Sequence, residues 1–100
     1  MTVYNITCKV RWEILEGWLA WQREEQVPAT LATGFFDEYR FFRLLEQEEE
    51  EGPTFVIQFL TSSLERYQRF LMESEPGLRR AGWEKWGSGY IAFRTLMESV

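Results

Sequence analysis

Residues 35–62, FFDEYRFFRLLEQEEEEGPTFVIQFLTS, place two apolar segments on either side of an acidic tip. Residues 35–47 carry aromatic and apolar side chains on both parities, which is typical of a strand covered on both faces. The tip, Glu48 to Gly52 followed by Pro53, predicts a turn, and residues 54–62 predict the returning strand. The centre of the chain is therefore expected to form a β-hairpin.

Toward the amino terminus the sequence predicts a strand and then a helix. Residues 2–10, TVYNITCKV, alternate with a period of two, which is typical of a strand. The more apolar of its two faces carries Tyr4, Ile6, Cys8 and Val10. From Trp12 onward the apolar residues recur at helical spacing instead.

Pro28 is expected to interrupt this helix. Proline lacks a backbone donor and disfavours helical geometry at the preceding residue, Val27, so the helix should end or kink there. Residues 28–33, PATLAT, then predict one short helical turn with proline at its first position. Gly34 is suited to a left-handed cap that redirects the chain into the hairpin.

After the hairpin the sequence predicts a second helix and a final strand. Ser62 and Glu65 form a capping-box pattern at the start of the helix. Pro76 is expected to interrupt it, and Gly87 and Gly89 to end it. Residues 89–99, GYIAFRTLMES, then predict the last strand. The apolar side of this helix is expected to carry Leu64, Tyr67, Leu71 and Leu78, with Phe70 at its margin.

The predicted order is strand, helix, strand, strand, helix, strand. This is the ferredoxin-like βαββαβ pattern of the α+β class, in which a four-stranded antiparallel sheet carries both helices on one face. A length of 100 residues predicts one domain, residues 1–100.

Because two helices cover only one face of such a sheet, residues of the other parity should form an open face. A surface this apolar usually marks an interface or a ligand site. The simplest solution is a homodimer in which two sheets pack face to face into a dimeric α+β barrel. The predicted open face consists of Val3, Asn5, Thr7 and Lys9, then Val56, Gln58 and Leu60, and finally Tyr90, Ala92, Arg94 and Leu96.

Three polar residues, Asn5, Gln58 and Arg94, fall on this predicted face. Burying a polar group without a partner costs about 1–3 kcal/mol, so these residues should be bonded to one another, to water or to a ligand. Two interpretations remain open, a structural network at the dimer interface and a small polar pocket inside the barrel. The candidate pocket or interface residues are Asn5, Thr7, Gln58, Arg94 and Gln26.

The charge and composition disfavour several partner classes. A net charge of −5 opposes binding to nucleic acids or anionic membrane surfaces, which requires clustered Lys and Arg. Cys8 is the only cysteine, no apolar run approaches the ~20 residues that span a bilayer, and no signal-peptide layout is present. We expect a cytoplasmic protein without a cofactor, whose partners are a second copy of the chain and, if the barrel is hollow, a small-molecule ligand.

Four segments resemble a family of short bacterial proteins. They are VYNIT at residues 3–7, the WxxW helix running into VPATLATG at residues 27–34, RLLE at residues 43–46 and FRTLMES at residues 93–99. Together they are similar to domain of unknown function 4286 over almost the whole chain. The resemblance implies the dimeric α+β barrel group and brings no established activity. It also implies that Gln26 stands where members of the family typically carry histidine.

The absence of histidine limits the chemistry of this chain. An amide at Gln26 neither titrates nor makes a good metal ligand, so it does not replace a histidine base or ligand. The usual metal clusters, Ser-His-Asp triads and Cys-His pairs are also absent. Cys8 is expected in the core, and the acidic run at residues 46–51 is expected to be a solvated hairpin tip rather than a calcium loop.

Three functions are compatible with these observations. The sequence favours a dimeric module that binds a small ligand or a protein partner without catalysis. The first alternative is a cofactor-independent monooxygenase-like enzyme acting on a small aromatic substrate oriented by Asn5, Trp and Arg side chains, which is an analogy of fold alone. The second alternative is a purely structural homodimer whose barrel is filled by bulky side chains.

Overall fold

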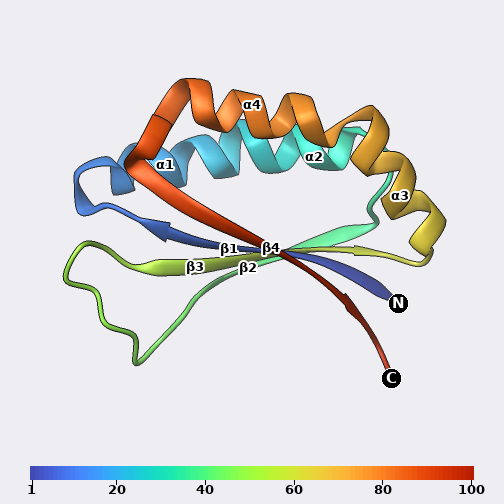
Figure 1. Cartoon of the computed structure of the whole chain (residues 1–100), viewed down its shortest axis with the longest axis horizontal. Coiled ribbons are helices and arrows are strands. Elements are labelled where there is room, and N and C mark those ends of the chain that lie inside the picture. The colour runs from blue at the N-terminus through green and yellow to red at the C-terminus, as the bar shows by residue number, and fades with distance from the viewer.

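The computed structural model describes residues 1–100 and consists of a twisted antiparallel sheet with helices over one face (Figure 1). The sheet has four strands in the order β2-β3-β1-β4, so the predicted ferredoxin-like βαββαβ fold of the α+β class is confirmed. The elements are β1 (Thr2–Val10), the 3₁₀ turn η1 (Trp12–Ile14), α1 (Leu15–Trp21), the π-helical turn η2 (Gln22–Gln26), α2 (Val27–Ala32), β2 (Glu38–Arg43), β3 (Thr54–Thr61), α3 (Leu64–Glu73), α4 (Glu75–Trp86), the 3₁₀ turn η3 (Gly87–Gly89) and β4 (Tyr90–Glu98).

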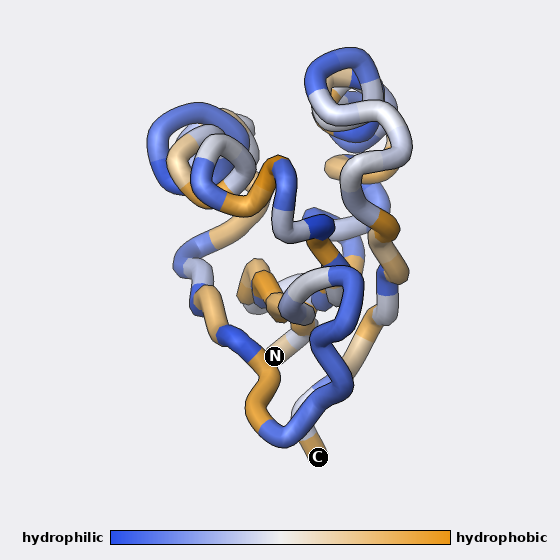
Figure 2. The backbone as a smooth tube through the Cα atoms, turned by 90° about the vertical axis from the view of Figure 1, so that its left-hand side faces the viewer, coloured by the Kyte–Doolittle hydropathy of each residue, from blue (hydrophilic) through white to orange (hydrophobic).

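The helices form one layer and the sheet forms the other. Viewed end-on, two helical segments lie side by side over the sheet, and no helix covers its opposite face (Figure 2). Both edges of β1 are paired, one with β3 and the other with β4, so β1 lies inside the sheet. None of the helices is long and apolar enough to cross a membrane.

The strand register assigns side chains to the two faces. Asn5 lies opposite Gln58 on β3, so the residues predicted for the open face on β1 and β3 do share one face. On β4 the predicted parity is wrong, because Arg94 lies opposite Ile6 and therefore faces the helices. Both parities of β4 are apolar, so its sequence does not distinguish the faces. The open face of β4 instead carries Ile91, Phe93, Thr95 and Met97.

The first helix continues through Pro28. Val27 keeps helical angles, φ −62° and ψ −48°, although it precedes proline. The Val27 N–H donates to the carbonyl of Gln22 five residues earlier, which widens the helix into the π turn η2. The helix was expected to end or kink at the proline. It instead widens by one residue just before Pro28 and then continues. The helix stops at Gly34, whose φ of 81° confirms the predicted left-handed cap.

The second helix departs from the expected pattern at its start and along its buried side. Ser63, one residue after the predicted cap, accepts a hydrogen bond from the Arg66 N–H at 3.3 Å. Phe70, which was expected at the margin, is the buried residue of α3, whereas Leu64 and Leu71 are 46% and 38% exposed. The reason is geometric, since Phe70 and these leucines occupy different sides of the helix and the larger aromatic ring is the one buried.

The ends of α4 agree with the expectations. Ser74 leaves helical geometry between α3 and α4, and Pro76 lies in the first turn of α4. The helix stops at Gly87, whose positive φ of 53° suits a residue without a Cβ.

The second strand is shorter and more exposed than predicted. It covers Glu38–Arg43 and lies at the edge of the sheet. Phe41 packs against the rings of Trp18 and Phe55, but Phe42 on the other face is 48% exposed. Only one face of β2 is covered within the chain, so the expectation of two covered faces is not met.

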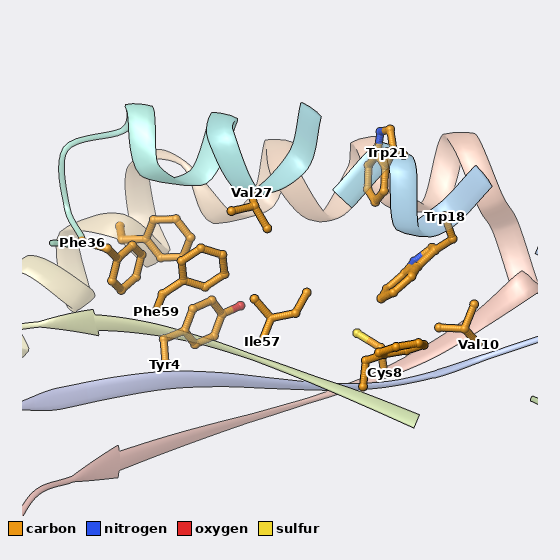
Figure 3. Close-up of a cluster of buried hydrophobic side chains, with 11 residues drawn as sticks. Tyr4, Cys8, Val10, Trp18, Trp21, Val27, Phe36, Ile57 and Phe59 are labelled. Carbon is orange, nitrogen blue, oxygen red and sulfur yellow. The ribbon is translucent and has the colours of Figure 1, made fainter. Parts of the chain in front are cut away.

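The core between the layers contains two large groups of aromatic rings (Figure 3), and Trp21 pairs separately with Trp86 at 6.2 Å between the ring centroids. One group surrounds Tyr4, and the other surrounds Trp18. Cys8 is 1% exposed, which confirms its predicted core position. No ring contact joins the two groups, whose members are Tyr4, Phe35, Phe36, Tyr39, Phe59, Tyr67 and Phe70 in the first and Trp18, Phe41, Phe55 and Tyr90 in the second.

Two glycines of α4 provide a test of this packing. A Cβ at Gly82 would meet the hydroxyl oxygen of Tyr90, whereas a Cβ at Gly77 would meet nothing within 4 Å. Gly82→Ala should lower the free energy of unfolding by about 1–3 kcal/mol because the core is overpacked. Gly77→Ala should raise it by about 0.5–1 kcal/mol through helix propensity. Urea unfolding at one protein concentration measures the free energy of unfolding of both variants. The same change in Gly82→Ala and Gly77→Ala would contradict this packing.

Candidate functional site

A cavity of about 40 Å³ lies between the sheet and the helices. A buried water needs roughly 10–15 Å³ on this scale, so the cavity has room for about three water molecules. It is bounded by Tyr4, Phe59 and Phe70 from the first aromatic group and by Tyr90 from the second. The cavity therefore occupies the space that the two aromatic groups leave between them.

Polar side chains reach the cavity wall from both layers. The helical layer contributes Gln22 and Gln26 from the two ends of the π turn, with Thr30 further along α2. The sheet contributes Tyr4 and Arg94 from the neighbouring strands β1 and β4. Glu75 and Arg79 come from the start of α4.

The two glutamines of the π turn differ in their bonding. The side-chain amide of Gln26 donates to the Leu78 carbonyl at 2.8 Å and so ties the first helix to α4. Gln22 is 5% exposed and lines the cavity, yet its amide makes no hydrogen bond within the chain. Its amide atoms are not among the fully buried polar atoms of the chain, so they remain accessible to water or to a ligand in the cavity.

Tyr4 and Arg94 form a hydrogen-bonded pair on the wall. The Arg94 Nε donates to the Tyr4 hydroxyl oxygen at 3.1 Å. Burial raises the pKa of Tyr4 to about 12, and the Arg94 charge opposes this shift. The phenol is therefore protonated at neutral pH, and its own hydrogen has no acceptor in the chain. Figure 3 shows its oxygen directed along the layer toward Ile57 rather than back to the Phe36 side.

The charged groups at the cavity do not balance. Glu75 is 7% exposed and pairs with Arg79, with 3.2 Å between Oε1 and Nε. Arg94 has no carboxylate within ion-pair distance, so two guanidinium groups face one carboxylate. Both arginines are exposed to solvent, so the one excess positive charge lies at the outer side of the cavity.

A wider hollow adjoins the cavity on the outside of the molecule. Its volume is about 140 Å³, and it shares Arg79, Tyr90, Ala92 and Arg94 with the inner cavity. Trp83 forms part of its wall and is 65% exposed. The two arginines thus stand where the outer hollow meets the inner cavity, between α4 and the edge strand β4.

The predicted candidate residues divide between two places. Gln26 and Arg94 lie at the cavity, whereas the other three lie on the open face of the sheet. There the Asn5 amide donates to the Thr7 hydroxyl at 3.2 Å, and the Gln58 amide donates to the Asn5 carbonyl oxygen at 3.3 Å. Asn5 does not reach Arg94, because the two side chains lie on opposite faces of the sheet.

Five polar residues of the cavity wall were missed by sequence reasoning, namely Tyr4, Gln22, Thr30, Glu75 and Arg79. Tyr4 carried a signal, since its hydroxyl is a polar group on the apolar parity of β1. Gln22 also carried one, because it precedes Gln26 by four residues and so shares its side of a helix. Glu75 and Arg79 carried none, because their exposure depends on how α4 starts after Ser74.

The sequence of the whole chain, residues 1–100, matches the family model described as Domain of unknown function (DUF4286). No curated protein matches the chain in sequence.

Several solved structures share the fold at low identity. An ethyl tert-butyl ether D (EthD) family protein from Bacillus halodurans C-125 matches with a TM-score of 0.74 and 12% identity, over 100% of both chains. A dimeric ferredoxin-like protein from an uncultured marine organism matches with a TM-score of 0.68 and 10% identity, over 99% of this chain and 94% of the other. SnoaB, a cofactor-independent oxygenase from Streptomyces nogalater, matches with a TM-score of 0.64 and 12% identity, over 98% of this chain and 91% of the other. At these identities the likeness concerns the fold alone.

Two buried acids predict a loss of stability in alkali. Burial raises the pKa of Cys8 from 9.0 to about 12 and that of Tyr4 from 10.0 to about 12. The unfolded chain releases these protons near pH 9 and 10, but the folded chain holds them until about pH 12. The free energy of unfolding should therefore be unaffected below pH 9 and fall above it, by up to about 1.4 kcal/mol per pH unit for each group.

Urea unfolding between pH 7 and 10.5 measures this loss. In Cys8→Ala the decline between pH 9 and 10 should be shallower than in the unaltered chain, because the variant has no thiol to ionise on unfolding. A decline of equal slope in both proteins would contradict a buried, protonated thiol.

Proposed function

The chain belongs to the DUF4286 family, as four short sequence segments had predicted, and on this premise we propose that it is a homodimeric module that binds a small molecule. The binding site is the cavity between the sheet and the helices, and the interior of the dimeric barrel serves as the interface. No catalytic step is assigned to this module.

The observation that carries this proposal is the amide of Gln22. In a completely filled core we would expect an apolar side chain at this position, because an amide that loses its water without gaining a protein partner destabilises the fold. The chain instead holds Gln22 at the cavity wall, at the start of a π turn that also carries Gln26. π-helical turns occur frequently at functional sites, which is consistent with a binding role for this one.

The open face of the sheet supports the homodimer. Four large apolar side chains on it are exposed within a single chain, and one solved structure of similar fold is described as dimeric. Packing this face against its twofold copy would remove the apolar surface from water. The bonded set Asn5, Thr7 and Gln58 would then lie inside the interface with its mutual hydrogen bonds already made. The exposed apolar side chains are Phe42 (48%), Ile91 (59%), Phe93 (64%) and Met97 (38%).

A cofactor-independent oxygenase activity is the second candidate. It is favoured by the protonated Tyr4 beside Arg94 at a partly open cavity, and by the fold shared with SnoaB. It is disfavoured by the position of Asn5, which was expected to orient a substrate but lies on the far face of the sheet. A shared fold does not transfer an activity, so the binding module is the better supported function.

Native mass spectrometry of freshly purified protein tests the binding role. We expect a dimer with additional mass that is released on denaturation. Gln22→Met should lose this mass and, measured without ligand, should raise the free energy of unfolding by about 1–2 kcal/mol, because an unpaired amide is removed. Gln68→Met, which changes an exposed glutamine of α3, is the matched control and should alter neither quantity. A bare dimer together with a destabilised Gln22→Met would support the purely structural alternative.

The open face can be tested separately. Phe93→Glu places a charge at the proposed interface, where burying it without a partner should raise the dimer dissociation constant at least about 100-fold. Met72→Glu introduces the same charge at an apolar side chain of α3 that is 84% exposed, and it should leave the dimer intact. Sedimentation equilibrium measures both. A dimer unaffected by Phe93→Glu would move the interface to another surface.

A further inference from the structure

We propose that the ligand of this cavity is a small aromatic acid, a flat ring carrying one carboxylate, with the carboxylate held by Arg94 at the inner cavity and the ring lying in the outer hollow beside Trp83. This inference rests on the proposed binding function and adds the chemical class of the ligand. It follows from the charge, the free hydrogen-bond donors and the sizes of the two spaces.

The charge of the site favours an anion with a single charge. Arg79 is neutralised by Glu75, whereas Arg94 lacks a carboxylate partner in the chain. One carboxylate on the ligand would therefore leave the site neutral. A cationic ligand would add to the existing excess charge, although the nearby Glu75 and aromatic rings would otherwise suit an amine.

The bonding of Arg94 leaves the right donors free. Its Nε is used by Tyr4, and neither terminal nitrogen has a hydrogen-bond partner in the chain. Two parallel N–H groups on one edge of a guanidinium match the two oxygens of a carboxylate. The hydroxyl hydrogen of Tyr4 and the amide of Gln22 are further donors on the same wall without acceptors in the chain. The terminal nitrogens of Arg94, the hydroxyl of Tyr4 and the amide of Gln22 are all hydrogen-bond donors. An anion that accepts hydrogen bonds would pair with them.

The positive field of Arg94 extends into the cavity. Its charge acts to lower the pKa values of Tyr4, Cys8 and Tyr90, against the effect of burial, which raises all three. These side chains all line the cavity, so an anion placed there would experience the same stabilising field.

The two spaces match the two parts of such a ligand. The inner cavity of about 40 Å³ accepts a group the size of a carboxylate and is too small for a ring. The outer hollow of about 140 Å³ is open to solvent, so a ring would lie in it against one wall without being enclosed. Trp83 and Tyr90 provide aromatic surface there, and Trp83 is 65% exposed without a ligand. The arginines at the junction fix the order, with the charged group inward and the ring outward.

The test compares acids with neutral and cationic compounds of the same shape. Benzoate, benzamide and benzylamine form one series, and 2-naphthoate, 2-naphthamide and 2-naphthylmethylamine form another. Chemical-shift titrations of ¹⁵N-labelled dimer should give tighter binding for the acid of each series, with shifts at Gln22, Trp83 and Arg94. Arg94→Met should weaken binding of the acid about 10- to 100-fold, with Arg94→Lys intermediate, because lysine keeps the charge and loses the paired donors. Arg80→Met removes a neighbouring arginine that does not line either space, and it should leave affinity unchanged.

Specific outcomes would overturn the inference. Equal affinity for acid and amide, tighter binding of the amine, or equal losses in Arg94→Met and Arg80→Met would each exclude recognition of a carboxylate by Arg94. The acid–amide comparison uses the unaltered protein, so it stands even if Arg94→Met fails to fold. If none of the six compounds binds while native mass spectrometry finds a bound molecule lost in Gln22→Met, the aromatic acid is excluded and the binding function stands. If neither experiment finds a ligand, both proposals fail.

Discussion

The pairing of β1 with both of its neighbours is the constraint on which the rest of this structure depends. Because β1 lies between β3 and β4, its alternation decides which side chains of all three strands face the helices. Tyr4 faces the helices, and the register then brings Arg94 to the same face, one strand away. A slip of one residue in either pairing would exchange the two faces, putting apolar rings in water and separating the donors of the cavity.

The cavity arises from a compromise between packing and polarity. Two aromatic groups fill the ends of the layer between sheet and helices, and the space between them is bordered by amide, hydroxyl and charged groups. Closing this gap with aromatic rings would bury those polar groups against apolar surface, which is unfavourable for any that lack a hydrogen-bonding partner. The π turn contributes to this arrangement, since it widens the helix before Pro28 and delivers Gln22 and Gln26 to the wall. The π turn before Pro28 thus contributes polar side chains to the cavity wall.

Much of the fold followed from the sequence, and the misses have physical reasons. The bounds of β1 were predictable because its alternation is strict and ends where helical spacing begins at Trp12. The face of β4 was not predictable, because both of its parities are apolar and only hydrogen bonding to β1 selects between them. Consequently Arg94 was recognised as a polar residue needing a partner but was assigned to the wrong side. Gln26 was identified only through the family resemblance, and Tyr4 was overlooked because tyrosine counts as apolar in pattern reading.

The adjacency of β1 and β4 also has a kinetic consequence. Ile6 and Arg94 lie opposite each other although almost the whole described chain separates them in sequence. Contacts between residues this far apart in sequence require an unfavourable loop-closure entropy before they stabilise the folded state, so they form slowly. The hairpin of β2 and β3 and the individual helices depend on much closer contacts. We expect β4 to dock late in folding, so that the wall bearing Arg94 is completed only after the core around Tyr4 has begun to pack.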